Sequence, residues 1–150
     1  MTLTRKQQGF TIVELLIVII VIGILATLVL VTFSGIQQSA RNTQRQTDIK
    51  AVASHLETYN AKNAFYPTSD DLNNVTSATW VASNLKGLDK ESTRDPKGTV
   101  YTFAAAATSN QYGYAVTPSG CDNTAGNECT GFSLTYIEEG TGTTKTVNNL

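Results

Sequence analysis

The chain has 150 residues, a formal net charge of −1 at pH 7, and 15% charged residues. This length suits one modest domain, and the weakly acidic balance lacks the basic footprint of a general nucleic-acid binder. The single histidine, His55, is expected on an exposed helix surface, and no phosphate-loop, dinucleotide or His-Glu-x-x-His pattern occurs. We therefore expect no enzymatic activity, no cofactor and no metal site.

The N-terminal part is dominated by an apolar run from Phe10 to Phe33. As a helix it would rise about 36 Å, enough to cross a bilayer core of roughly 30 Å. Arg5 and Lys6 precede the run, which favours a cytoplasmic N-terminus and an exterior C-terminal part. Glu14 lies inside the run, and an acid in such a place is a functional hypothesis by default.

Three interpretations of this run compete. A conventional signal peptide would have a shorter apolar core, with Thr32-Phe33-Ser34 as a passable cleavage site. An uncut membrane anchor would place Glu14 at the interface or at the positive end of the helix. The third interpretation uses the leader, the glycine, the aromatic residue and the acid together.

These features resemble the N-terminal signature of the type IV pilin and pseudopilin family. In that family a short basic leader ends in Gly, Phe usually follows, and Glu stands fifth from the new N-terminus; here these are Gly9, Phe10 and Glu14, followed by Leu15-Leu16-Ile17-Val18. The resemblance implies that prepilin peptidase cuts between Gly9 and Phe10 and methylates the new Phe10 amine. It also implies a cleaved leader over residues 1–9, a membrane-spanning and filament-core helix half over 10–34, and an extracellular globular domain over 35–150.

A charge pair between subunits would follow from that cleavage. The cut leaves a positive amine on Phe10 next to hydrocarbon, and the Glu14 carboxylate of a neighbouring subunit could neutralise it. Two desolvated opposite charges stabilise each other, whereas either one left alone is costly. Alternatively, Glu14 merely favours the positive N-terminus of its own helix. The chain departs from many pilins at Val31, where they carry a proline.

The helix is predicted to continue to about Asn63. Its second half carries an apolar stripe at three- and four-residue steps, formed by Ile49, Val52, Ala53, Leu56 and Tyr59. Arg41 and Arg45 share a helix face and are interpreted as a solvated or inter-subunit charge patch, with Asp48 as a possible partner of Arg45.

Shorter elements follow the long helix. Pro67 ends it, and Phe65-Tyr66-Pro67-Thr68 resembles the Tyr-Pro-Thr that often stands at this point in the family. Thr68 or Ser69 is the expected N-cap of a short helix through Leu72. A second short helix is expected over Trp80–Leu85, ending at Gly87.

From Thr99 onward the pattern alternates, as in strands. Four strands are predicted, over Val100–Ala105, Tyr112–Val116, Phe132–Ile137 and Thr143–Val147. The short connections between them favour an antiparallel sheet. The expected fold is therefore α+β and pilin-like, with a long N-terminal helix packed on an antiparallel sheet of about four strands.

Cys121 and Cys129 lie far from the apolar run, on the side predicted to be exterior, where disulfides persist. A polar loop separates them, and we predict that they form a disulfide. Two cysteines and a distant histidine do not make a structural zinc site.

The favoured function is a structural subunit, a major pilin, that polymerises into a type IV pilus. The resemblance implies a homopolymer, a prepilin peptidase, an assembly machinery with a cytoplasmic ATPase, and residence in the membrane before assembly. The alternatives are a pseudopilin of a type II secretion or DNA-uptake apparatus, a minor pilin, or a monomeric membrane-anchored binding module.

Overall fold

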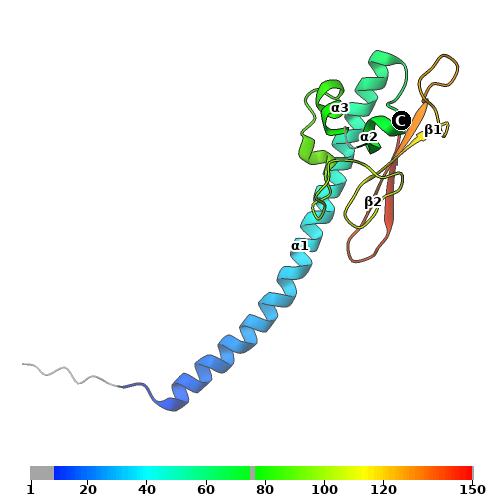
Figure 1. The fold of residues 1–150 in the computed structure, drawn as a ribbon. Coiled ribbons are helices and arrows are strands. Elements are labelled where there is room, and N and C mark those ends of the chain that lie inside the picture. Colours follow the sequence, from blue (N-terminus) through cyan, green and yellow to red (C-terminus); the bar gives the residue numbers. More distant parts are fainter. Residues whose placement is uncertain (1–8, 75–76, 150) are drawn as a thin grey trace, which may run out of the picture. The chain divides into compact units, whose positions relative to one another are not determined.

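The computed structural model describes residues 9–74 and 77–149, so most of the predicted leader lies outside the described residues. Figure 1 shows one long helix followed by short helices and a small sheet. In chain order the elements are α1 (Ile12–Asn63), α2 (Ser69–Asn73), α3 (Ser77–Asn84), the 3-10 helix η1 (Lys90–Thr93), β1 (Gly113–Thr117), β2 (Gly131–Ile137) and β3 (Thr144–Asn148). The predicted α+β fold is confirmed.

The chain divides into two compact units between Gln37 and Gln38. In the first unit, every large apolar side chain that the structure describes from Phe10 to Ile36 is between 48% and 90% exposed. By length and composition α1 is able to cross a membrane. An exposed apolar helix of this kind is compatible with a single-pass membrane anchor.

The second unit contains the hydrophobic core. The stripe predicted on α1 packs there, because residues three and four apart share one helix face, although its members Ala53 and Tyr59 are only partly buried. Ile49, Val52 and Leu56 have no exposed surface. Side chains from the other elements complete this core: Leu72, Val81, Leu85, Phe103, Tyr112, Tyr114, Phe132, Leu134 and Tyr136.

The end of α1 and the start of α2 are set by local chemistry. Ala64 adopts a left-handed conformation with φ 68°, which stops the helix after Asn63. Thr68 is the N-cap of α2, and it forms a capping box with Asp71. The predicted cap is therefore confirmed. The second predicted short helix is α3, which begins three residues earlier than expected.

The sheet is antiparallel in the order β1-β2-β3. It has three strands rather than about four, because residues 100–105 do not form a strand. Only Ala104 makes a bridge, to Gly113. The chain crosses Gly113 so closely that a Cβ there would collide with the Ala107 backbone and the Thr135 hydroxyl. Pairing between residues 100–105 and β1 is therefore limited to the bridge at Ala104, just before this close approach.

Candidate assembly site and the domain that carries it

The first turn of α1 holds the predicted assembly residue Glu14. Its Oε2 atom accepts hydrogen bonds from the Thr11 backbone N–H and the Thr11 hydroxyl, both at 2.8 Å. The Glu14 backbone N–H donates to the Thr11 hydroxyl oxygen at 3.3 Å. Thr11 and Glu14 thus form a capping box, which satisfies donors that a helix start otherwise leaves unpaired.

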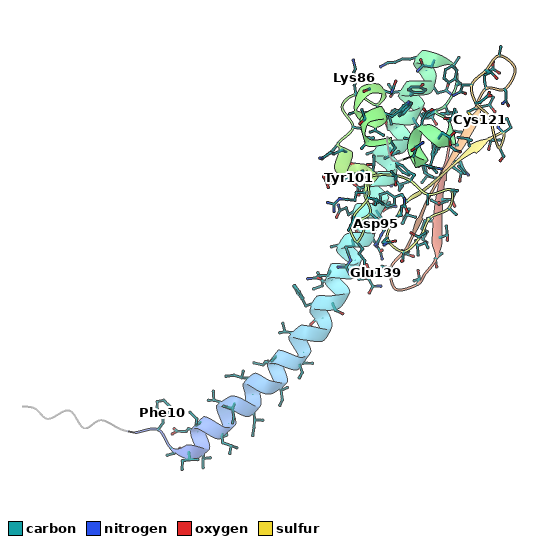
Figure 2. The ribbon with its side chains drawn as sticks, in the orientation of Figure 1. Phe10, Lys86, Asp95, Tyr101, Cys121 and Glu139 are labelled. Carbon is teal, nitrogen blue, oxygen red and sulfur yellow. A yellow bond between two sulfur atoms is a disulfide. The ribbon has the colours of Figure 1, made fainter. Side chains whose placement is uncertain are left out.

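The predicted cleavage site lies immediately before this turn. Phe10 is 90% exposed, and Gly9 has no other atom near the position that a Cβ would take. Figure 2 labels Phe10 at the start of the helix. The peptide bond between Gly9 and Phe10 thus lies outside the helix, between two exposed residues.

The apolar part of α1 satisfies its hydroxyl groups internally. The Thr27 hydroxyl donates to the Ile24 carbonyl at 2.8 Å, and the Thr32 hydroxyl donates to the Leu28 carbonyl at 2.6 Å. Such bonds let threonine lie on an apolar helix without an unpaired donor. Glu14 is the only formal charge between Lys6 and Arg41, which makes it the main polar feature of this helix half.

A buried ion pair joins α1 to the turn before the sheet. The Arg45 guanidinium donates to both Asp95 oxygens, at 2.6 and 3.0 Å, and also to the Asn42 side chain at 2.9 Å. The side chains of Arg45 and Asp95 are 1% and 2% exposed. The interpretation of Arg45 as part of a solvated or inter-subunit patch is therefore wrong, and its partner is Asp95 rather than Asp48.

A more exposed ion pair lies beside the buried one. Both oxygens of Glu139 accept from Arg41 at 2.7 Å, and Lys97 Nζ lies 3.3 Å from Glu139. The hydrogen bonds from Arg41 lower the pKa of Glu139 to about 2. Figure 2 shows Asp95 and Glu139 beside the same stretch of α1. These two ion pairs and Lys97 form one group of five charged side chains, Arg41, Arg45, Asp95, Lys97 and Glu139.

Asp48 lies one turn after Arg45 and is 8% exposed. The Tyr112 hydroxyl donates to it at 3.0 Å. Burial raises the pKa of Asp48 to about 6, although the hydrogen bonds from Tyr112 and Ser92 oppose this change. The nearby carboxylates of Asp89 and Asp95 also raise it. Asp48 is thus a buried acid that forms no ion pair with any described residue, since Arg45 pairs with Asp95 and Glu139.

The two cysteines form a disulfide with a Cα–Cα distance of 5.2 Å, and the loop they close contacts Tyr66, shortly after the end of α1. The Asn123 side chain accepts from the Cys129 N–H at 2.8 Å and donates to the Tyr66 carbonyl at 2.9 Å. The Tyr66 N–H donates to the Cys129 carbonyl at 2.8 Å. The loop therefore holds the segment after α1 against the start of β2. Within residues 9–74 and 77–149, no group of three or more His, Cys, Asp or Glu side chains is placed to hold a metal ion.

Two of these features have signals in the sequence. Thr11 and Glu14 have the Thr-x-x-Glu spacing of a capping box. Arg45 lies four residues before Ile49 and seven before Val52, so extending the apolar stripe back by one turn places it on the buried face. Its partner Asp95 is 50 residues away and has no such signal. His55 is half-buried rather than exposed, because the loop at Gly87 passes beside it.

A long N-terminal apolar helix with a prepilin-type start, followed by a small antiparallel sheet, defines a pilin-like α+β protein. Comparison with protein families agrees with this class: residues 4–30 match the prokaryotic N-terminal methylation motif. Residues 33–135 match the type II secretion system (T2SS) protein G. The chain belongs to the type II secretion protein G family.

Curated relatives carry the same name, type II secretion system core protein G. The protein of Pseudomonas aeruginosa PAO1 is 31% identical over 117 residues, which cover 72% of this chain and 80% of the relative. That of Escherichia coli K12 is 33% identical over 109 residues, covering 69% and 75%. That of Aeromonas hydrophila is 34% identical over 103 residues, covering 65% and 72%. No solved structure matches the chain.

These matches favour the alternative prediction over the main one. The relatives are named for a secretion system, which agrees with a pseudopilin better than with the major subunit of a type IV pilus. The predicted resemblance to the pilin and pseudopilin family is confirmed, since that family includes both kinds of subunit.

Proposed function

We propose that this chain is a pseudopilin of a type II secretion apparatus, a non-enzymatic subunit that polymerises through α1. The observation that carries the proposal is the match of residues 33–135 to protein G behind a prepilin-type start. The exposed apolar side chains of α1 support it. In water they would be unfavourable, so they require lipid before assembly and neighbouring helices afterwards.

The predicted charge pair is compatible with the first turn of α1. Both Thr11 donors go to Oε2 of Glu14, and no described residue donates to Oε1. After cleavage, Oε1 is available to the Phe10 amine of a neighbouring subunit while Oε2 stays in the capping box. The two interpretations of Glu14, as a helix-start acid and as an inter-subunit partner, are therefore not exclusive.

The proposed partners and location follow from this function. Prepilin peptidase cuts after Gly9 and methylates Phe10, and a machinery with a cytoplasmic ATPase drives assembly. Before assembly the chain spans the cytoplasmic membrane once, with residues 10–34 in the membrane and the domain from residue 35 on the outer side. The subunits then form a homopolymer, and we propose neither a cofactor nor a strong contact with nucleic acid.

Processing is tested by determining the N-terminal residue of the mature protein, made together with its secretion apparatus. We expect methylated Phe10. A chain that starts near Gly35 would show conventional secretion, and one that keeps Met1 would show an uncut anchor; either result contradicts the proposal.

Assembly is tested with Glu14→Ala, assayed by cross-linking of neighbouring subunits and by secretion. We expect normal membrane insertion but loss of the polymer, because the Phe10 amine is left without its counter-ion. The matched control is Asp70→Ala, which removes an exposed acid in the second unit. Unchanged assembly of the Glu14 variant would end the charge-pair proposal. Long surface filaments composed mainly of this chain would instead favour the type IV pilus.

A further inference from the structure

The buried acid Asp48 lies where α1 meets the 3-10 helix η1 and the segment before β1. It accepts hydrogen bonds from the Tyr112 hydroxyl, at 3.0 Å, and from the Ser92 side chain of η1. An ionised carboxylate is costly in a buried place unless a cation neutralises it. The groups that face Asp48 therefore decide how well its charge is tolerated.

The groups around Asp48 do not neutralise that charge. Arg45, on the preceding turn of α1, is a cation, but each of its three guanidinium nitrogens already donates to another side chain. The acceptors are Asp95, Asn42 and Glu139. Asp89, which caps η1, and Asp95, in the turn after η1, are carboxylates whose charges oppose the ionisation of Asp48. Burial raises the pKa of Tyr112, so this residue stays a neutral donor.

The helix η1 has few attachments to the rest of the second unit. The N–H groups of Ser92 and Arg94 donate to carbonyls within residues 89–94, at 3.0 and 3.1 Å. In the part of the chain that the structure describes, no backbone hydrogen bond joins these residues to α1 or to the sheet. Side chains provide the attachment, through the pairs Ser92–Asp48 and Glu91–Tyr101 and the buried Thr93.

We propose that Asp48 is a proton-controlled latch that holds residues 89–94 against α1. Protonated Asp48 is a neutral buried acid, and the segment stays closed over it. Ionised Asp48 carries a buried charge that faces two other carboxylates, so the segment opens more often because opening admits water to that charge. The segment carries Lys90, Glu91 and Arg94, and the latch therefore controls how these side chains are presented on the surface. This inference does not depend on the proposed function.

The test is amide hydrogen exchange of the full chain in detergent micelles at a series of pH values, corrected for the intrinsic dependence of exchange on pH. The pKa of Asp48 is about 6 when it is buried, against an ordinary value of 3.8. The opening constant of the Ser92 and Arg94 amides should therefore rise about tenfold from pH 5 to pH 7. Asp48→Asn should abolish this rise, whereas Asp70→Asn, which changes an exposed acid, should leave it in place.

Two further measurements separate a latch from general unfolding. The amides of Val52 and Leu56, in the core, should open less often than those of Ser92 and Arg94 throughout this range. Ser92→Ala removes a donor that lowers the pKa of Asp48, so the rise in the opening constant should level off at a higher pH than in the wild type.

Four results would overturn the proposal. One is an opening constant of the Ser92 and Arg94 amides that is the same at pH 5 and pH 7. Another is a rise that persists in Asp48→Asn, since a different group would then control the segment. Equal opening of Ser92 and Leu56 would show that the whole unit unfolds at once. A rise that levels off at the wild-type pH in Ser92→Ala would show that Asp48 does not act through η1.

Discussion

Replacing Asp48 by asparagine should stabilise the second unit at neutral pH. The pKa of Asp48 is about 6 in the folded chain, against an ordinary value of 3.8. A difference of about two pH units corresponds to about 3 kcal/mol at a pH above both values. Asparagine recovers only part of this, because it accepts weaker hydrogen bonds from Tyr112 and Ser92 and adds donors that need acceptors. We expect a net gain of about 1–2 kcal/mol.

The pH dependence gives this prediction its sign. The folded state binds the Asp48 proton more tightly than the unfolded state does, so below pH 4 protonation of Asp48 stabilises the folded wild type. It loses that contribution as the pH rises from about 4 to 6. The Asp48→Asn variant lacks this loss, so its advantage should be small near pH 4 and complete near pH 7.

The measurement is denaturant unfolding of the full chain in micelles, followed by the fluorescence of Trp80, the only tryptophan. Trp80 is half-buried beside Tyr59, with ring centroids 5.4 Å apart, so unfolding should change its emission. Tyr112→Phe is the control, since it removes a donor to the Asp48 carboxylate and should destabilise more at pH 7 than at pH 4. A difference between Asp48→Asn and wild type that does not vary with pH would refute the reasoning, as would destabilisation at pH 7.

Two further predictions concern the contacts that hold the second unit together. Arg45→Met should destabilise the second unit by about 3–5 kcal/mol, because Asp95 is then left buried without its ion-pair partner. Combining Arg45→Met with Asp95→Leu should recover much of this loss. A double-mutant cycle of unfolding free energies measures the coupling between the two residues, and additive effects of the two substitutions would contradict the prediction. Replacing Cys121 and Cys129 by serine should lower the free energy of unfolding by about 2.5 kcal/mol in the same assay, because the loop that holds Tyr66 is then unconstrained in the unfolded chain. Equal stability of the variant and the oxidised wild type would contradict this prediction.

The elements that were predicted correctly are those controlled by neighbours in the sequence. The buried face of α1 follows from the spacing of Ile49, Val52 and Leu56. The start of α2 follows from the Thr68 cap and its reciprocal bond with Asp71. In both cases the partners are three or four residues apart, so the sequence alone contains the geometry.

The features that were not predicted depend on partners far along the chain. Arg45 is neutralised by Asp95, and Arg41 by Glu139, almost a hundred residues later. The expected strand over Val100–Ala105 does not form, and its contact with the sheet is the bridge from Ala104 to Gly113. None of these pairings leaves a periodic signal, so they appear only when the tertiary structure is known.

The same distinction explains why the N-terminal signature did not select the function. Gly9, Phe10 and Glu14 form a signature that is associated with cleavage, methylation and helix packing, and pilins and pseudopilins share this signature. A choice between them cannot come from the residues that both need. It comes from residues 33–135, where the match to protein G lies and which also contain the Arg45–Asp95 ion pair and the disulfide loop. What distinguishes a secretion subunit should therefore be sought on the surface of the second unit.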